Sequence, residues 1–285
     1  MTAVGIGLPQ TAPEALGTTL ELVERAGFDS AWVLEAAAVL DPLSVLAFAA
    51  ARTTAVKLGV AVLVLPLHQP VLLARALATI DRLSGGRTIA GLGVGSDQLP
   101  FEAFERRREE RSARFEDYLG VMRALWNDDA HAGPFVTLSG TALAPKPVQR
   151  PLPIWLGGGS PPALRRAARL ADGWVAPGPA ATADFARTAA RVRELVGGTR
   201  PFTIAKRVLV AVDRPPVAVD AWFRAVYGRP DDLGVVAAGD AAAVTERLLE
   251  TRAAGAEHVI VQPVGGGERA QLTAIAEHAL PALRR

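Results

Sequence analysis

The chain has 285 residues, a formal net charge of +2 and no cysteine, and it is 50% hydrophobic and 21% charged. Disordered chains combine low hydrophobicity with high net charge, so this composition indicates a folded globular protein. Because a net charge near zero provides no long-range field, we expect no nucleic-acid partner. The absence of cysteine excludes disulfides, thiol nucleophiles and cysteine-ligated metals.

The chain shows no signal for secretion or for membrane insertion. Its first residues lack a basic region, and the longest apolar run, residues 58–67, is shorter than the roughly 20 residues that cross a bilayer. We therefore expect a cytoplasmic protein without membrane contact.

Eight apolar, β-rich segments alternate with amphipathic segments along the chain. The predicted strands are 4–8, 30–34, 57–63, 88–93, 153–156, 174–176, 202–212 and 258–262. The predicted helices are 14–26, 42–51, 70–83, 101–126, 161–170, 183–196, 217–227, 241–254 and 268–283. This alternation is typical of a parallel sheet, and at this length it predicts an α/β fold of the (β/α)8 TIM-barrel type, with residues 1–285 as a single domain. A doubly wound open sheet would use fewer strands.

One segment interrupts the alternation between the predicted fourth helix and fifth strand. Residues 128–153 contain Gly133-Pro134 and four prolines, at 145, 147, 151 and 153. Such a composition predicts a short insertion, formed by a hairpin around residues 135–138 and an extended return.

Three glycines and a helix start follow the predicted fifth strand. The segment LGGGSP at 156–161 places Ser160 as N-cap and Pro161 at the first helical position. Glycine lets the backbone approach a ligand, and a helix N-terminus attracts anions, so the segment suits a phosphate. The donors would be the N–H groups of Gly158, Gly159, Ser160 and Ala163. An ordinary strand–helix turn is the alternative.

A second group of glycines, at positions 91, 93 and 95, recurs with the period of a strand. All three therefore share one face, which either meets a flat ligand or relieves crowding inside the barrel. The segment DRLSGGR at 81–87 combines a helix end with a glycine turn, and we interpret it as structural.

The titratable residues do not form an evident catalytic set. His68, His131, His258 and His278 lack metal-ligand spacing, so we expect no metal site. His68 and Glu35 each lie at the end of a predicted strand, where barrel active sites are found, and are the catalytic candidates. This scarcity favours chemistry carried by a cofactor.

Several segments together resemble the bacterial luciferase-like monooxygenase superfamily. They are AGFDSAWVLE (26–35), DPL (41–43), KLGV (57–60), LPLHQP (65–70), the block 80–95, PKPVQ (145–149), PIWLGG (153–158) and AARLADGW (167–174). The resemblance implies a (β/α)8 barrel that binds FMN or the deazaflavin coenzyme F420 at the carboxyl ends of its strands. It also implies a homodimer.

In such proteins the third strand often carries a bulge with a non-prolyl cis peptide against the flavin ring, which here would fall near residues 61–63. The resemblance places the ring beside this bulge and the glycine strand, and the phosphate on the glycine turn. The implied cofactor-binding residues are Ala61, Val62, Leu63, Gly93, Gly95, Gly157, Gly158, Gly159, Ser160 and Trp174.

The chain departs from part of this superfamily at two positions. Many F420-dependent relatives have a histidine directly after the acidic residue that ends strand two, whereas alanines 36–38 follow Glu35 here. Ser96-Asp97 stands where some F420-dependent dehydrogenases have glutamate. These departures argue against a sugar-phosphate dehydrogenase and favour hydride transfer by the cofactor alone.

The predicted function is that of a coenzyme F420-dependent oxidoreductase, which transfers a hydride between the deazaflavin and a small organic substrate. One alternative is an FMN-dependent monooxygenase that uses O2 and takes reduced flavin from a separate reductase. Another is a barrel that binds a flavin without turnover.

Overall fold

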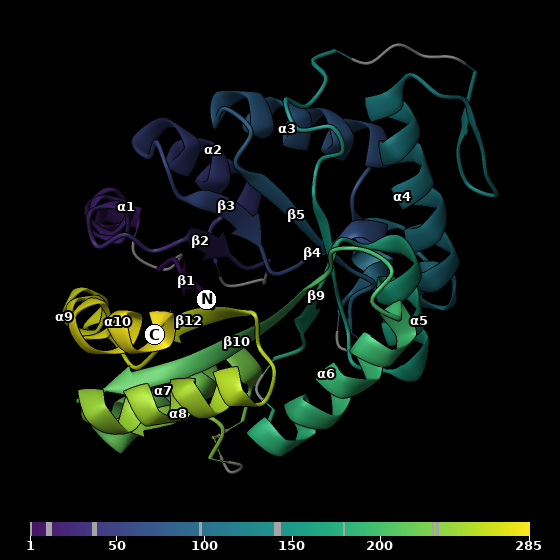
Figure 1. The fold of residues 1–285 in the computed structure, drawn as a ribbon. Coiled ribbons are helices and arrows are strands. Elements are labelled where there is room, and N and C mark those ends of the chain that lie inside the picture. The colour runs from purple at the N-terminus through teal and green to yellow at the C-terminus, as the bar shows by residue number, and fades with distance from the viewer. Residues whose placement is uncertain are drawn as a thin grey trace.

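Eight parallel strands close into a barrel that helices surround (Figure 1). The computed structural model describes residues 2–9, 13–35, 39–96, 99–139, 144–178, 180–229, 231 and 234–285. The barrel strands are β1 (Ala3–Gly7), β2 (Ser30–Val33), β3 (Lys57–Val60), β5 (Thr88–Gly93), β8 (Ile154–Gly157), β9 (Gly173–Ala176), β10 (Thr203–Val212) and β12 (His258–Pro263). They pair in chain order, and β10 pairs with both β9 and β12, which closes the ring. The predicted (β/α)8 fold is confirmed.

Two short strands extend this barrel. β4 (Leu63–Val64) resumes the predicted third strand after a break at Ala61 and Val62 and pairs with β5. β11 (Ala237–Gly239) pairs in parallel with the end of β10, and sequence analysis did not predict it. Its three small residues carry too little strand signal to be recognised alone.

The helices follow the predicted order. They are α1 (Leu16–Arg25), α2 (Pro42–Arg52), α3 (Pro70–Leu83), α4 (Arg111–Asn127), α5 (Pro161–Leu170), α6 (Thr182–Val196), α7 (Pro216–Tyr227), α8 (Ala241–Ala253), α9 (Glu268–Ala274) and α10 (Leu280–Arg284). The predicted helix 101–126 begins as two separate turns, Phe101–Phe104 and Arg108–Glu110, before α4. A π-helical turn, Ile275–Ala279, joins α9 to α10. Of the helices described, none has both the length and the apolar character needed to cross a membrane.

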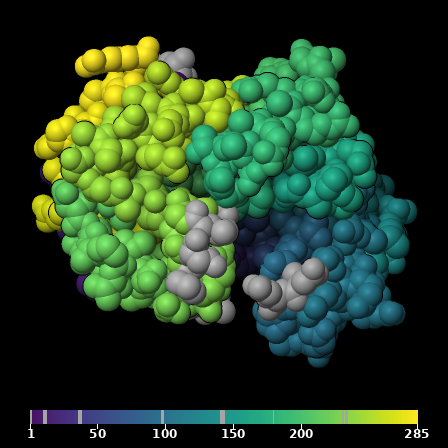
Figure 2. Space-filling model, turned by 90° about the horizontal axis from the view of Figure 1, so that it is seen from below, coloured from purple at the N-terminus to yellow at the C-terminus, as the bar shows by residue number. Residues whose placement is uncertain are grey.

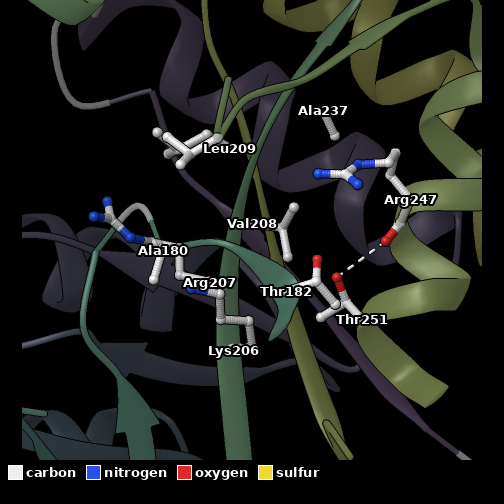
Figure 3. A pocket seen from close by; sticks show the side chains of 10 residues that line it. Ala180, Thr182, Lys206, Arg207, Val208, Leu209, Ala237, Arg247 and Thr251 are labelled. Carbon is white, nitrogen blue, oxygen red and sulfur yellow. Dashed lines mark hydrogen bonds between the residues drawn. The ribbon is translucent and has the colours of Figure 1, made fainter. Parts of the chain in front are cut away.

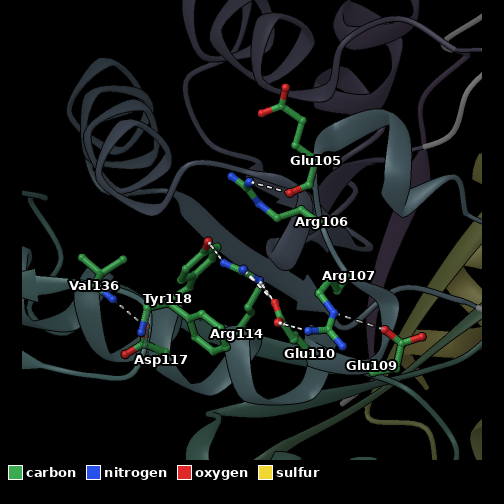
Figure 4. A network of polar contacts seen from close by, with 10 residues as sticks. Glu105, Arg106, Arg107, Glu109, Glu110, Arg114, Asp117, Tyr118 and Val136 are labelled. Carbon is green, nitrogen blue, oxygen red and sulfur yellow. Dashed lines mark hydrogen bonds and ion pairs between the residues drawn. The ribbon is translucent and has the colours of Figure 1, made fainter.

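The insertion lies where it was predicted, between α4 and β8. It contains the antiparallel hairpin of β6 (His131–Ala132) and β7 (Thr137–Leu138), so the predicted strand at 135–138 is only two residues long. Asp117 on α4 fixes this hairpin, because its buried carboxylate accepts hydrogen bonds from the N–H groups of Phe135 and Val136 and pairs with His131 at 2.7 Å. Figure 4 shows Asp117 reaching Val136.

A second group of contacts orders the approach to α4. Arg114 binds the carboxylate of Glu110 at 2.7 Å and the hydroxyl of Tyr118 at 3.0 Å (Figure 4). The hydrogen bond to Glu110 raises the pKa of Arg114, although burial acts in the opposite direction. The guanidinium also lies over the ring of Phe135, 4.1 Å from its centroid. Arg114 therefore joins α4 to the insertion.

The segment 81–87 is structural, as predicted. The buried carboxylate of Asp81 accepts hydrogen bonds from the N–H groups of Val148 and Gln149, at 2.7 and 2.9 Å, in the proline-rich return of the insertion. Arg87 donates to the carbonyl oxygens of Thr53 and Val56 at the end of α2. Both side chains thus satisfy backbone groups that no strand or helix pairs.

Two indole rings fill the middle of the barrel. Trp32 and Trp155 stack with 5.1 Å between centroids, and His258 packs edge-on against both. Neighbouring strands make room with glycine: a Cβ at Gly59 would lie 2.3 Å from the Trp32 ring, and one at Gly173 would lie 2.7 Å from Trp155. These glycines are needed for space rather than for a turn.

His258 is the polar member of this interior cluster. Its Nε2 lies 2.8 Å from the hydroxyl of Ser30, which accepts a hydrogen bond from the indole N–H of Trp32. Burial lowers the pKa of His258 from 6.5 to about 4, and Asp29 raises it only in part. The ring is therefore neutral near neutral pH.

We predict that protonation of His258 makes the fold acid-sensitive. Because its pKa is about 6.5 unfolded and about 4 folded, the unfolded chain binds the proton first. The stability contributed by the neutral ring is complete above pH 6.5 and decreases as the pH falls towards 4, by about 2 kcal/mol between pH 7 and pH 5. Urea unfolding at the two pH values measures this loss. His258→Gln should remove most of the difference, and an equally acid-sensitive variant would contradict the assignment.

Candidate functional site

A cavity of about 620 Å³ opens at the carboxyl ends of the barrel strands from β3 to β9, and Arg207 of β10 also lines it. Figure 2 shows a hollow between the blue surface of the earlier chain and the teal and green surfaces of the later chain. The described residues that line it are Ala61, Val62, Gly93, Val94, Gly95, Ser96, Arg111, Ser112, Gly157, Gly158, Gly159, Ser160, Pro162, Ala163, Arg166, Val175, Ala176, Pro177, Gly178 and Arg207.

Eight of the ten residues predicted to bind a cofactor line this cavity. They are Ala61, Val62, Gly93, Gly95, Gly157, Gly158, Gly159 and Ser160. The other two, Leu63 and Trp174, are fully buried and are not among the described lining residues. Trp174 donates a hydrogen bond from Nε1 to the carbonyl oxygen of Gly158, and its ring stacks on Phe185. Trp174 therefore supports the glycine turn from behind.

Val62 forms one wall of the cavity. The peptide bond between Ala61 and Val62 is cis, within the stretch 61–63 where the family resemblance implied one. A Cβ at Gly93 would lie 2.6 Å from a methyl group of Val62, and one at Gly157 would lie 3.2 Å from both methyl groups. The two glycines therefore accept the Val62 side chain between them and still present bare backbone to the cavity.

The sequence left two roles open for the glycines of β5, packing inside the barrel and contact with a ligand. The structure divides the glycines between packing and the lining of the cavity. A Cβ at Gly91 would lie 1.7 Å from the carbonyl oxygen of Val60, and Gly91 is not among the described lining residues, so its role is packing. Gly95 lines the cavity with φ of +88°, a conformation that favours glycine.

The glycine turn leads directly into α5. Gly158 has φ of +114°, and Ser160 caps the helix by accepting a hydrogen bond from the N–H of Ala163. The predicted donor at Ala163 is therefore used within the cap. Among the turn, loop and side-chain hydrogen bonds of the described residues, none uses the N–H groups of Gly158, Gly159 or Ser160. These groups and the helix N-terminus form a seat for an anion.

Three arginines add positive charge to the cavity lining. Arg166 on α5 pairs with Glu116 at 3.1 Å, and Arg111 begins α4. Arg207 on β10 donates from Nη2 to the hydroxyl of Tyr227 at 2.8 Å, whereas its buried Nη1 has no hydrogen-bond partner. Arg207 therefore keeps one nitrogen without a hydrogen-bond partner beside the cavity.

Lys206, the neighbour of Arg207, lies on the other face of β10. Burial lowers its pKa to about 8, and its ammonium donates to the carbonyl oxygen of Gly178 at 3.1 Å. It also lines a small space of about 20 Å³ beside Thr182 and Thr251. Figure 3 shows the Arg207 guanidinium pointing away from these threonines. Lys206 therefore supports the cavity wall at Gly178.

The structure pairs the two catalytic candidates with each other. Glu35 Oε1 lies 2.6 Å from His68 Nε2, and Glu35 Oε2 accepts a hydrogen bond from the N–H of Val64 in β4. Neither residue is among the described lining residues. The sequence signal for this pair was their shared position at the ends of adjacent strands. The alanines at 36–38 and Asp97, on which the two departures rest, lie outside the described residues.

The described lining residues supply no acid or base. They include no histidine, aspartate or glutamate. In addition, no three such residues among those the structure describes gather into a group that could hold a metal ion. A barrel with glycines and an anion seat at its carboxyl end is the architecture of enzymes that bind a phosphorylated cofactor or substrate.

A family model described as luciferase-like monooxygenase matches residues 2–272. The chain belongs to this family of oxidoreductases and monooxygenases. It is 33% identical over 177 residues to a putative coenzyme F420-dependent oxidoreductase of Mycobacterium tuberculosis, an alignment that covers 57% of this chain and 51% of that protein. The chain thus spans about half the length of the curated relatives it matches.

Two solved structures show the same fold at low sequence identity. The monooxygenase RslO1 from Streptomyces bottropensis superposes with a TM-score of 0.85 and 23% identity, over 98% of this chain and 99% of that chain. The coenzyme F420-dependent tetrahydromethanopterin reductase from Methanopyrus kandleri superposes with a TM-score of 0.82 and 19% identity, over 99% of both chains.

We predict that Glu35 stabilises the bulged strand. Glu35→Ala removes the acceptor of the Val64 N–H, and we expect it to lower the free energy of unfolding by about 1–3 kcal/mol. Glu35→Gln keeps an amide oxygen that can still accept from Val64, so its loss should be smaller. Chemical unfolding of both variants measures the difference, and two equal losses would show that the acceptor at this position is unimportant.

Proposed function

We propose that this chain is a coenzyme F420-dependent oxidoreductase that transfers a hydride between the deazaflavin and a small organic substrate. The observation that carries the proposal is the cavity, where a backbone anion seat and a flat, glycine-lined wall lie at the same end of the barrel. The anion seat suits the phosphate of a phosphorylated, planar cofactor, and the glycine-lined wall suits its ring.

Different lining residues would hold the phosphate end and the ring end of such a cofactor. The N–H groups of Gly158, Gly159 and Ser160 would hold the phosphate at the start of α5. Val62 and Gly93 would contact the flat ring. Arg207 offers its unpartnered Nη1 to a carbonyl or anionic oxygen of the bound ligand. When bound, the deazaflavin accepts or donates the hydride, and the chain orients it and excludes water.

Two findings support F420 as the cofactor. A relative that is 33% identical is named as a putative coenzyme F420-dependent oxidoreductase. The described lining residues also lack an acid or base, which suits a reaction in which the cofactor carries the reacting hydride.

An FMN-dependent monooxygenase is the second candidate. The family that includes this chain is described as luciferase-like monooxygenase, and the anion seat would accept the FMN phosphate equally well. In this case a separate reductase would supply the reduced flavin.

Titration of the apo-protein with the two cofactors separates these candidates. We expect F420 to bind with a Kd in the micromolar range and FMN to bind at least ten times more weakly, because a relative that is 33% identical is named as a putative coenzyme F420-dependent oxidoreductase. Absorbance and fluorescence of each cofactor report binding. FMN binding without F420 binding would replace the proposal by the second candidate, and binding of neither would contradict both.

Ser160 provides a test of the anion seat with a matched control. Aspartate and asparagine both cap helices as well as serine does, so neither Ser160→Asp nor Ser160→Asn should disturb α5. Only aspartate adds a negative charge beside the predicted phosphate. We expect Ser160→Asp to weaken cofactor binding at least tenfold, whereas Ser160→Asn stays within about threefold of the original protein. Equal affinities would show that the phosphate binds elsewhere.

A further inference from the structure

A second pocket lies at the same end of the barrel, beside the carboxyl ends of β1, β2 and β12. Its volume is about 60 Å³, and apolar side chains from these strands and from helices α7 and α9 form most of its walls. They include Leu8, Leu34, Trp222, Val226 and Leu272. None of its described lining residues also lines the cofactor cavity.

One buried polar side chain lines this apolar pocket. Gln262, near the end of β12, is only 7% exposed. Its Nε2 donates to the carbonyl oxygen of Pro263 at 3.4 Å, but its Oε1 has no hydrogen-bond partner. An unpaired buried acceptor is costly, and native structures nearly always satisfy it. A hydrogen-bond donor carried by a ligand would supply the missing partner.

Gly7 creates the space for this amide oxygen. The register of β1 and β12 pairs Ile6 with Val261, so Gly7 lies beside Gln262. A Cβ at Gly7 would be 1.9 Å from Gln262 Oε1. Any side chain at position 7 would therefore displace the Gln262 amide from its present place. Both residues line the same small pocket, and the unpartnered amide oxygen is buried between the two strands.

We propose that this pocket binds the substrate of the oxidoreductase and that Gln262 accepts a hydrogen bond from a hydroxyl or N–H group of that substrate. The proposal rests on the proposed function, which assigns the larger cavity to the cofactor. In the ring of strands the pocket borders β12, β1 and β2, whereas the cofactor cavity borders the strands from β3 to β10. Both are at the end of the barrel where active sites lie.

The lining also defines the class of substrate. Apolar walls favour an aliphatic or aromatic body. A carboxylate or phosphate group would meet the acceptor oxygen of Gln262 and the carboxylate of Glu268, which also lines the pocket. The structure therefore indicates a neutral, largely apolar molecule with one donor group, such as an alcohol, a phenol or an amide.

Phenol and toluene form a matched pair of probes, because they have almost the same shape and only phenol has a donor. Both are titrated into the apo-protein, and NMR shifts report the two Kd values. We expect both probes to bind to the original protein. Gln262→Met keeps the length of the side chain but removes the amide. In this variant we expect the Kd of phenol, divided by the Kd of toluene, to rise at least fivefold. A smaller change in this ratio, or no binding of either probe, would overturn the proposal.

The unchanged protein gives a second measurement in case Gln262→Met does not fold. The carbonyl carbon of the Gln262 side chain should shift on addition of phenol and remain unshifted with toluene. Equal responses would overturn the proposal. Neither measurement needs a cofactor. A protein that binds neither F420 nor FMN refutes the proposed function, whereas failure of the phenol test alone leaves that function intact.

Discussion

The close packing of two indole rings inside the barrel is the constraint on which the rest of the structure depends. Trp32 and Trp155 stack across the interior and occupy space that Gly59 and Gly173 on the neighbouring strands leave free. This layer fills the interior of the barrel, and the cavity lies above it, at the carboxyl ends of the strands. The neutral, buried His258 belongs to the same layer and couples the integrity of this layer to pH.

Above this layer the site is shaped by glycines, which have no side chain, rather than by reactive side chains. Gly93 and Gly157 receive Val62 and leave backbone exposed, and the turn at Gly158 leads into a capped helix that attracts an anion. On the other side of the ring of strands, Gly7 leaves room for the side-chain amide of Gln262. The chain thus provides shape, an anion seat and a few hydrogen-bonding groups, which is consistent with chemistry carried by a cofactor.

Three carboxylates, of which Asp81 and Asp117 are buried and Glu35 is half-buried, hold the segments that lie outside the barrel pattern. Asp81 and Asp117 each bind two consecutive backbone N–H groups of the insertion, and Glu35 binds the N–H of Val64 after the bulge. These three carboxylates therefore accept hydrogen bonds from backbone groups that have no partner in a strand or helix. Glu35 also pairs with His68, the other catalytic candidate, through its second carboxylate oxygen.

The sequence by itself determined the order of strands and helices, the closed barrel, the place of the insertion, and the glycines and cap of the anion seat. These features depend on local periodicity and on residues adjacent in the chain, such as Ser160 and Pro161. Only the tertiary structure decided which glycines serve packing, that Trp174 supports the turn from behind, and that Glu35 meets His68. It also decided that Gln262 is unpartnered, because contacts between distant strands depend on register and burial, which no local pattern encodes.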